Sequence, residues 1–232
     1  MAITWIQSTQ GISGAGVTSF AGAYGTNTTA NSYLLALGLV SGLTAVTMTA
    51  TDTLGNTWTQ IGSNMTDTIN QYALFQVPKN VAAGANTVTL HSTVSSTLAM
   101  VIVEYTGQVQ AGAPLDTSTF FGSGNTGAVT IGPIAGNQTN EEYIGIAWVN
   151  SAAAVVPNSG YTTRDATAQH IIIDQAFSGT GSRTGGWTFT ASSVAAWLLS
   201  VKSTTSAAPA TTTNWVSGYR SFVNKRGSGK LR

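Results

Sequence analysis

The side chains that could carry out chemistry are few and far apart in this sequence. The chain has no cysteine, and its only histidines are His91 in "TLHST" and His170 in "AQHIIID". A metal site or a catalytic triad needs partners at fixed spacings, such as H-E-x-x-H or G-x-S-x-G, and neither spacing occurs. We therefore expect both histidines to have structural roles on strands.

The positions of the carboxylates in the sequence do not indicate a catalytic acid–base pair either. A glycosidase needs two of them facing each other across a cleft. Glu104 lies in the apolar segment "MVIVEYTG" and is the one whose surroundings suggest a raised pKa, but a bridge to a neighbouring strand explains it more simply. We expect no enzymatic activity and no cofactor. The full set is Asp52, Asp67, Glu104, Asp116, Glu141, Glu142, Asp165 and Asp174.

Calcium and sugar are the two ligands that the remaining polar and aromatic residues could take. The segments "TDTLGN", "NMTDTIN" and "NQTNEE" offer oxygen ligands, but Asp and Asn also serve turns, and turn chemistry is the better interpretation. Aromatic faces could stack on pyranose rings, yet an aromatic on a strand is more often part of the core. We thus predict no metal site and core positions for four tryptophans: Trp58, Trp148, Trp187 and Trp197.

The composition and the spacing of turn-forming residues favour an all-β protein. Hydrophobic residues make up 42% of the 232 residues and charged residues only 7%, against about 25% charged in ordinary soluble domains. Short β-branched or aromatic segments alternate with Gly, Asn, Pro and Ser. We expect strands near residues 3–7, 32–41, 45–51, 57–61, 71–77, 86–93, 97–105, 117–121, 128–131, 143–149, 169–177, 186–190 and 195–202.

These strands predict a two-sheet antiparallel sandwich, jelly-roll-like, over residues 1–202, in which residues 1–30 could form a separate N-terminal strand or arm. In "DTLGN", Gly55 and Asn56 can take the positive φ of a tight turn, and Asp52 can bind backbone amides across it. The run "TLAMVIVEYTG" is apolar at successive positions, which predicts a strand buried on both faces. No helical periodicity persists before residue 214.

Four segments together resemble a β-sandwich module of bacteriophage structural proteins and bacterial surface proteins. They are "DTLGNTWTQIG", "YALFQVPKNVAAGANTVTL", "MVIVEYTG" and "PLD". The resemblance covers about residues 30–202 and rests on turn and core residues. It implies an architecture and a structural or adhesive setting, and it transfers no functional site.

The last thirty residues differ from everything before them. Residues 203–213, "STTSAAPATTT", predict an extended linker. Beyond it, Asn214 can cap a short amphipathic helix that Gly227 closes. Its apolar stripe falls at i, i+4, i+7 and i+8, and cations lie beside it. The predicted anchor residues of this basic aromatic tail, 214–232, are Trp215, Tyr219, Arg220, Phe222, Val223, Lys225 and Arg226.

Charge separates the tail from the body. Residues 1–202 carry four cations and all eight acids, a net charge of −4, whereas residues 203–232 carry five cations and no acid, a net charge of +5. A helix of this length is marginal in water, so its stripe needs a partner. Three partners are open: the chain's own sandwich, another protein subunit, and nucleic acid or an anionic membrane surface. Because the body is acidic and the tail helix has few cations, the protein subunit is favoured.

Together these features suggest a phage virion protein. The N-terminal "MAITWIQSTQ" lacks the cationic and apolar regions of a signal peptide, and no apolar run approaches the length of a membrane span. A hydroxyl-rich, cysteine-free protein made in the host cytoplasm and released by lysis fits both facts. We expect a capsid decoration or head-fibre protein, present in many copies or as a homo-oligomer and anchored by the tail. The alternative is a glycan-binding adhesin or receptor-binding tail module.

Overall fold

The computed structural model describes residues 2–42, 45–67, 69–108, 113–137, 139–149, 156–167, 169–179 and 181–204, without the side chains of 121–128 and 189–193. All regular elements in these ranges are β-strands with antiparallel pairing. Within the same ranges, no helix has the length and apolar character of a membrane span. The predicted all-β antiparallel sandwich is therefore confirmed.

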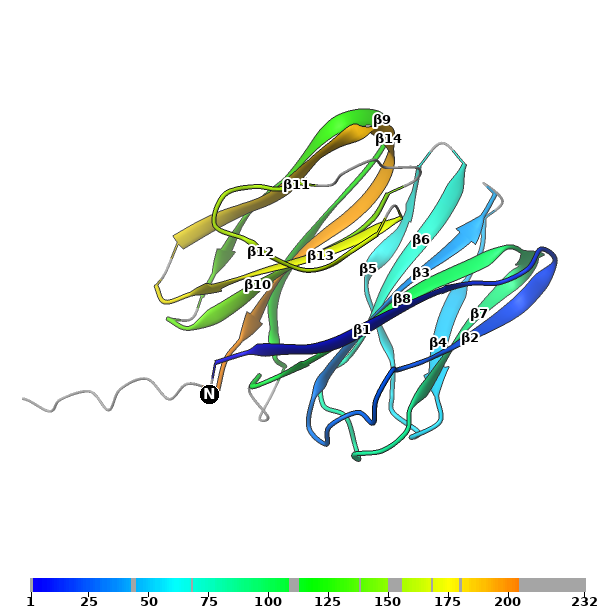
Figure 1. Ribbon diagram of the computed structural model, residues 1–232, viewed down its shortest axis with the longest axis horizontal. Helices are drawn as coiled ribbons and strands as arrows, with labels where there is room; N and C mark the ends of the chain where they lie inside the picture. The colour runs from blue at the N-terminus through cyan, green and yellow to red at the C-terminus, as the bar shows by residue number, and fades with distance from the viewer. Residues whose placement is uncertain are drawn as a thin grey trace, which may run out of the picture.

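Fourteen strands build three hydrogen-bonded sheets (Figure 1). The strands are β1 (Thr4–Ile12), β2 (Val17–Ala23), β3 (Tyr33–Ser41), β4 (Met48–Asp52), β5 (Thr59–Thr66), β6 (Asn70–Val77), β7 (Thr87–Ser96), β8 (Leu98–Thr106), β9 (Leu115–Gly136), β10 (Glu141–Val149), β11 (Val156–Pro157), β12 (Thr162–Ala166), β13 (His170–Phe177) and β14 (Gly181–Lys202).

The sheets are stacked in layers. The central sheet has the order β1-β8-β3-β6-β5, and the N-terminal outer sheet has the order β2-β7-β4. The C-terminal sheet contains β14-β10-β13-β12, with β9 and β11 paired to β14. Figure 1 shows the central sheet between the other two.

The inner strands of the central sheet, β3, β6 and β8, are buried on both faces, which explains their continuous apolar runs. On β3, Leu35 and Leu37 belong to the core shared with Ile146 and Trp197 of the C-terminal sheet. The alternate residue Leu34 belongs to the core shared with the N-terminal outer sheet. Since successive side chains of a strand point to opposite faces, the residues of β3 on either face must be apolar. The predicted double burial of the "MVIVEYTG" strand is likewise confirmed, since β8 is buried from Leu98 to Tyr105.

A fourth layer covers the outer face of the C-terminal sheet. Residues 194–202 of β14 pair with β10 on one side and with the first half of β9 on the other. The far halves of the two strands, residues 181–188 of β14 and 128–136 of β9, pair with each other. These far halves fold back over the sheet, where Trp187 packs in one core with Tyr143 and Leu198. Burial of a large apolar side chain stabilises a fold by roughly 1.5–3 kcal/mol, so this cover contributes substantially.

The structure differs from the sequence prediction in three respects. The strands form three sheets rather than two. The segments predicted separately at 117–121 and 128–131 are one strand, β9, and those at 186–190 and 195–202 are one strand, β14. Two edge strands, β2 and β12, were not predicted because most of their residues are at least partly exposed and carry no apolar alternation.

The N-terminal residues and the "DTLGN" turn refine the prediction further. Residues 4–23 are built into the central and N-terminal outer sheets through β1 and β2. Gly55 has the expected positive φ of 75°, whereas Asn56 is absent from the positive-φ residues. Asn56 instead donates its backbone and side-chain amides to Asp52, 2.9 and 2.7 Å away, and this bonding holds the turn.

Candidate functional site

The predicted anchor residues lie outside the described residues. The seven are Trp215, Tyr219, Arg220, Phe222, Val223, Lys225 and Arg226. What the structure does define is the point from which the tail continues. That point is Thr204, directly after β14.

The end of β14 is fixed from several sides. The Thr204 amide donates to the Gly107 carbonyl at 2.7 Å, and the Ser203 amide donates to the Asn140 carbonyl at 3.2 Å. Gly107 follows the central sheet and Asn140 precedes β10, so the exit is tied to both sheets.

A salt bridge adds to this attachment. Lys202 Nζ lies 3.1 Å from Asp116 Oδ1. Burial by itself would raise the pKa of Asp116, but the hydrogen bond from the Asn137 amide and the Lys202 ammonium outweigh burial and lower that pKa. The chain is thus held firmly at the residue where the linker begins.

Both histidines have local partners, in agreement with the structural roles that we expect for them. His91 Nε2 lies 3.0 Å from Thr51 Oγ1 on the paired strand β4. His170 is buried, and its Nδ1 lies 2.8 Å from Gln10 Oε1 of the central sheet. Burial lowers the pKa of His170 more than the neighbouring Asp165 raises it.

Ser8, Asp165 and His170 meet at this place but not in the order of a catalytic relay. Ser8 donates its hydroxyl hydrogen bond to Asp165 Oδ2, not to the imidazole. His170 Nε2 lies 3.1 Å from the same carboxylate oxygen. A nucleophilic serine needs the histidine as its direct base, so this group holds two sheets together rather than activating a hydroxyl.

Glu104 has the strand-bridging role that the simpler interpretation predicts. Its carboxylate is fully buried and accepts hydrogen bonds from Gln7 Nε2 on β1 and from the Thr29 amide, both at 2.6 Å. Two donors satisfy a buried carboxylate. Glu104 therefore joins β8 to β1 and to the loop before β3.

The acidic loops considered for calcium are organised by turn bonding. Asp67 accepts bonds from the amides of Ile69 and Asn70, each at 2.7 Å, and from the Tyr72 hydroxyl at 2.5 Å. Asp52 likewise accepts hydrogen bonds from the backbone amide of Asn56 and from the side-chain amide of Asn86. Across the described part of the chain, no three acidic, histidine or cysteine residues group as metal ligands would.

The tryptophans are core residues for the most part. Trp148, Trp187 and Trp197 are buried, and Trp58 is partly buried against the core beneath the N-terminal outer sheet. Of the aromatic side chains that the structure describes, Phe120 alone is exposed, at 51%. It borders a shallow depression lined by Asn64, Met65 and Thr66 of β5.

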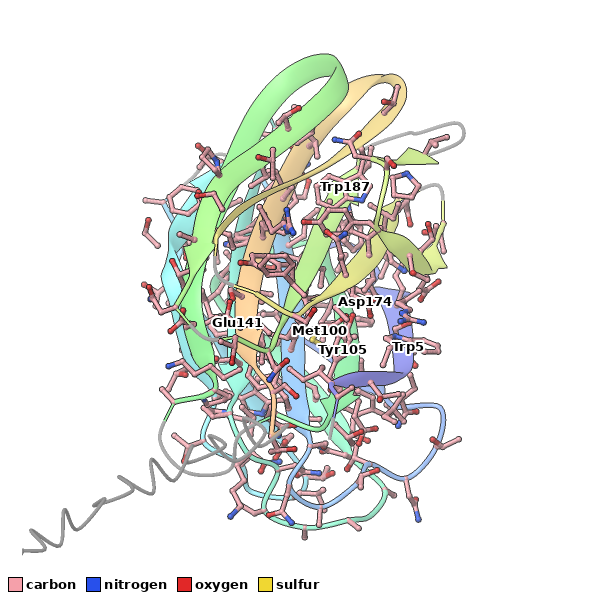
Figure 2. All side chains as sticks on the ribbon, turned by 90° about the vertical axis from the view of Figure 1, so that its left-hand side faces the viewer. Trp5, Met100, Tyr105, Glu141, Asp174 and Trp187 are labelled. Carbon is pink, nitrogen blue, oxygen red and sulfur yellow. The ribbon has the colours of Figure 1, made fainter. Side chains whose placement is uncertain are left out.

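Sequence reasoning missed a group of ionisable residues between the central and C-terminal sheets. Asp174 on β13 is buried, and Arg164 Nε donates to its two oxygens at 2.8 and 2.7 Å. The buried Tyr105 of β8 faces this pair, and its pKa is raised by burial, then by Asp174 and Glu142. Glu142 on β10 completes the group; burial, and secondarily the Asp174 charge, raise its pKa to about 8. Figure 2 labels Tyr105 and Asp174, which lie close to each other in that view.

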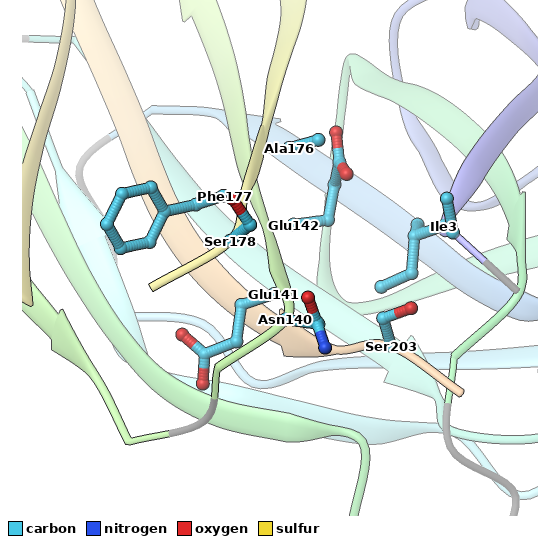
Figure 3. A pocket seen from close by; sticks show the side chains of 9 residues that line it. Ile3, Asn140, Glu141, Glu142, Ala176, Phe177, Ser178 and Ser203 are labelled. Carbon is cyan, nitrogen blue, oxygen red and sulfur yellow. The ribbon is translucent and has the colours of Figure 1, made fainter. Parts of the chain in front are cut away.

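A cavity of about 160 Å³ lies at the end of the C-terminal sheet, beside Glu142 (Figure 3). It is formed where β10 begins and where β13 and β14 end, and the N-terminal residues Ala2 and Ile3 lie along its side. Polar groups and apolar groups share the wall. The lining residues are Ala2, Ile3, Asn140, Glu141, Glu142, Ala176, Phe177, Ser178 and Ser203.

Comparisons with protein-family models, with curated proteins and with solved structures found no match to this chain. The architecture itself is plain: an all-β protein whose antiparallel sheets pack face to face as sandwiches.

Proposed function

We propose that this chain is a non-enzymatic structural protein of a phage particle, most simply a capsid decoration or head-fibre protein, attached through residues 214–232. The sandwich body is the displayed part, and the tail is the anchor. Trp215, Tyr219, Phe222 and Val223 bury apolar surface on a partner subunit. Arg220, Lys225 and Arg226 meet acidic groups of the same partner.

One observation supports this proposal most directly: the place where the tail joins the body. Residues 203–213, which precede the basic, aromatic segment, leave the body from a strand that is paired to β9 and β10 and tied to both sheets at Ser203 and Thr204. An anchor joined there transmits its hold to the whole body rather than to a loose end. The opposite net charges of body and tail also disfavour a nucleic-acid surface on the body.

The resemblance to phage structural modules supports the setting, and multiple copies on a lattice would add avidity to a weak tail contact. The jelly-roll-like description and the choice of capsid over tail remain parts of the same proposal. Virion localisation follows from it.

A glycan-binding adhesin or receptor-binding module is the second candidate, and one feature favours it. Phe120 offers an exposed aromatic face next to Asn64 and Thr66, which carry the amide and hydroxyl groups that bind sugar hydroxyls. A single aromatic gives a smaller stacking surface than a glycan platform of several rings. We therefore place this function second.

The two candidates are separated by matched variants. One replaces Trp215, Tyr219 and Phe222 together by Ala, and the other replaces Phe120 by Ala. Binding to purified particles that lack this protein, binding to a glycan array and thermal melting are measured for each. The anchor proposal requires that the triple variant melts like the parent chain but no longer binds particles, while Phe120→Ala still binds them. If the triple variant binds particles normally, the anchor proposal is wrong.

A further inference from the structure

Glu142 is a buried carboxyl with an unmet need for a partner. Only 4% of the residue is exposed, and no residue of the described chain gives its side chain a hydrogen bond. Buried carboxyl groups usually have hydrogen-bond partners, as Glu104 does with its two donors. Glu142 is thus an exception that asks for an explanation.

The charged groups around Glu142 do not supply one. Asp174 on β13 repels a second negative charge, and Arg164 on β12 is engaged by both Asp174 oxygens. Tyr105 on β8 is the remaining ionisable neighbour in this group; its hydroxyl interacts with Asp174, and no hydrogen bond joins it to Glu142. The side chain of Glu142 therefore keeps an unused acceptor in a place that already holds one buried acid.

Glu142 is one of the residues that line the cavity. Figure 3 shows Glu142 pointing away from Glu141 and lying between Ala176 and Ile3 at the cavity wall. Ile3 and Ala176 give the cavity an apolar side next to Glu142, whereas Asn140 and Ser203 bring an amide and a hydroxyl. A space of about 160 Å³ holds several waters or a short ligand.

We propose that this cavity binds the head of an organic cation, an alkylammonium or alkylguanidinium group, with Glu142 as its counter-ion. The cation neutralises a carboxylate that the fold leaves unpaired. Its short alkyl stem lies against Ile3 and Ala176, and its remaining N–H groups face the polar wall. The ligand is either a free small amine or a Lys or Arg side chain, for which the tail of this chain offers five candidates. The site stands whether or not the tail is an anchor.

The sign of the coupling to protons follows from the chemistry. Because the cation needs the ionised carboxylate, its binding must release a proton wherever Glu142 is neutral beforehand. With a pKa of about 8 for Glu142, the observed affinity should rise about tenfold per pH unit below pH 8 and level off above it.

The experiment titrates the full chain with butylamine and with ethylguanidinium from pH 6 to pH 9. Calorimetry in two buffers of different ionisation enthalpy counts released protons, and carboxyl NMR follows Glu142. We expect saturable binding, proton release at pH 7 and a fall in the pKa of Glu142. The matched variants are Glu142→Gln, which must lose binding, and Glu104→Gln, a buried carboxyl outside the cavity lining, which must keep it.

A second arm identifies the source of the cation. A synthetic peptide of residues 214–232 is titrated into the full chain in which the five cations of its own tail, Arg220, Lys225, Arg226, Lys230 and Arg232, are replaced by Gln. Saturable, Glu142-dependent binding of the peptide assigns the site to a basic side chain, whereas binding of butylamine without the peptide assigns it to a free amine. Binding that is unchanged in Glu142→Gln or independent of pH would overturn the proposal, as would the absence of saturable binding by any probe.

Discussion

Ser8 on β1 donates a hydrogen bond to Asp165 on β12, although the two residues are 157 positions apart in the sequence. The same strand reaches across again at Gln10, whose amide contacts Gln169 and His170. These bonds form a polar seam at one edge of the largely apolar interface between the central and C-terminal sheets. They fix how the two sheets are aligned, which apolar packing by itself does not.

The first prediction concerns this seam. Gln10→Ala removes the bonds to Gln169, Thr167 and the buried His170, whose Nδ1 keeps only Thr167 Oγ1 as a neighbour among the described residues. We expect a loss of about 1–3 kcal/mol in the free energy of unfolding, measured in urea. The control is Gln60→Ala, which removes an exposed hydrogen bond to Asn64 and should cost less than about 0.5 kcal/mol. Equal effects of the two substitutions would contradict a structural role for the seam.

The second prediction concerns pH. Glu142 has its pKa raised by burial from 4.5 to about 8, so its neutral form is the one that fits the fold. Its contribution to stability is complete below pH 4.5 and is lost as the pH rises through 8. Glu142→Gln keeps the neutral shape and should be more stable than the parent at pH 8 by an amount on the order of a few kcal/mol. Urea unfolding at pH 5 and pH 8 measures this, and an equal difference at both values would refute it.

The third prediction concerns the ion pair of Arg164 and Asp174. The Arg164 side chain is 36% exposed, while that of Asp174 is only 2% exposed. Arg164→Gln strands a buried charge and should cost about 2–4 kcal/mol, whereas Asp174→Asn leaves the arginine to water and should cost roughly half as much. Chemical unfolding of both variants at pH 7 tests the order. A larger loss in the free energy of unfolding for Asp174→Asn than for Arg164→Gln would contradict this order.

The fourth prediction concerns Gly136, the last residue of β9, which pairs with Gly181 at the start of β14. A Cβ at this position would lie 2.7 Å from the Tyr143 hydroxyl oxygen and would overlap Glu141 Oε2. We expect Gly136→Ala to lower the free energy of unfolding by at least about 2 kcal/mol, because buried groups must move. Gly14→Ala meets no atom within 4 Å and should be close to neutral or slightly stabilising. Thermal melting of the two variants makes the comparison, and similar melting temperatures would go against it.

The strands that the sequence predicts well are those whose both faces are apolar. β3, β8 and β10 carry long apolar runs because each lies between two layers, so local pattern and tertiary position agree. β2 and β12 are edge strands whose polar residues are acceptable at the surface, and nothing local marks them. The join of two predicted segments into β14 depends on pairing with β9, a long-range contact that no local signal carries.

The ionisable residues between the central and C-terminal sheets likewise could not be predicted from local sequence. Glu104 stands out in an apolar segment and is satisfied by Gln7 and Thr29, whereas Glu142 lies in the polar sequence "NQTNEE" and ends up buried without a hydrogen bond. Its burial arises because another sheet covers it. Sequence neighbours identify which residues can ionise, but only the packing of sheets sets their pKa values.

The position of β14 has a mechanical consequence. A pull on residue 204 acts along the axis of a strand that is hydrogen-bonded to β10 on one side and β9 on the other. The bonds lie perpendicular to that axis, so they are sheared together rather than broken one by one. We expect the body to withstand traction through its C-terminal end better than traction that peels the edge strand β12, and single-molecule pulling from the two points would measure the difference. Such a body resists force along the direction in which the chain leaves β14.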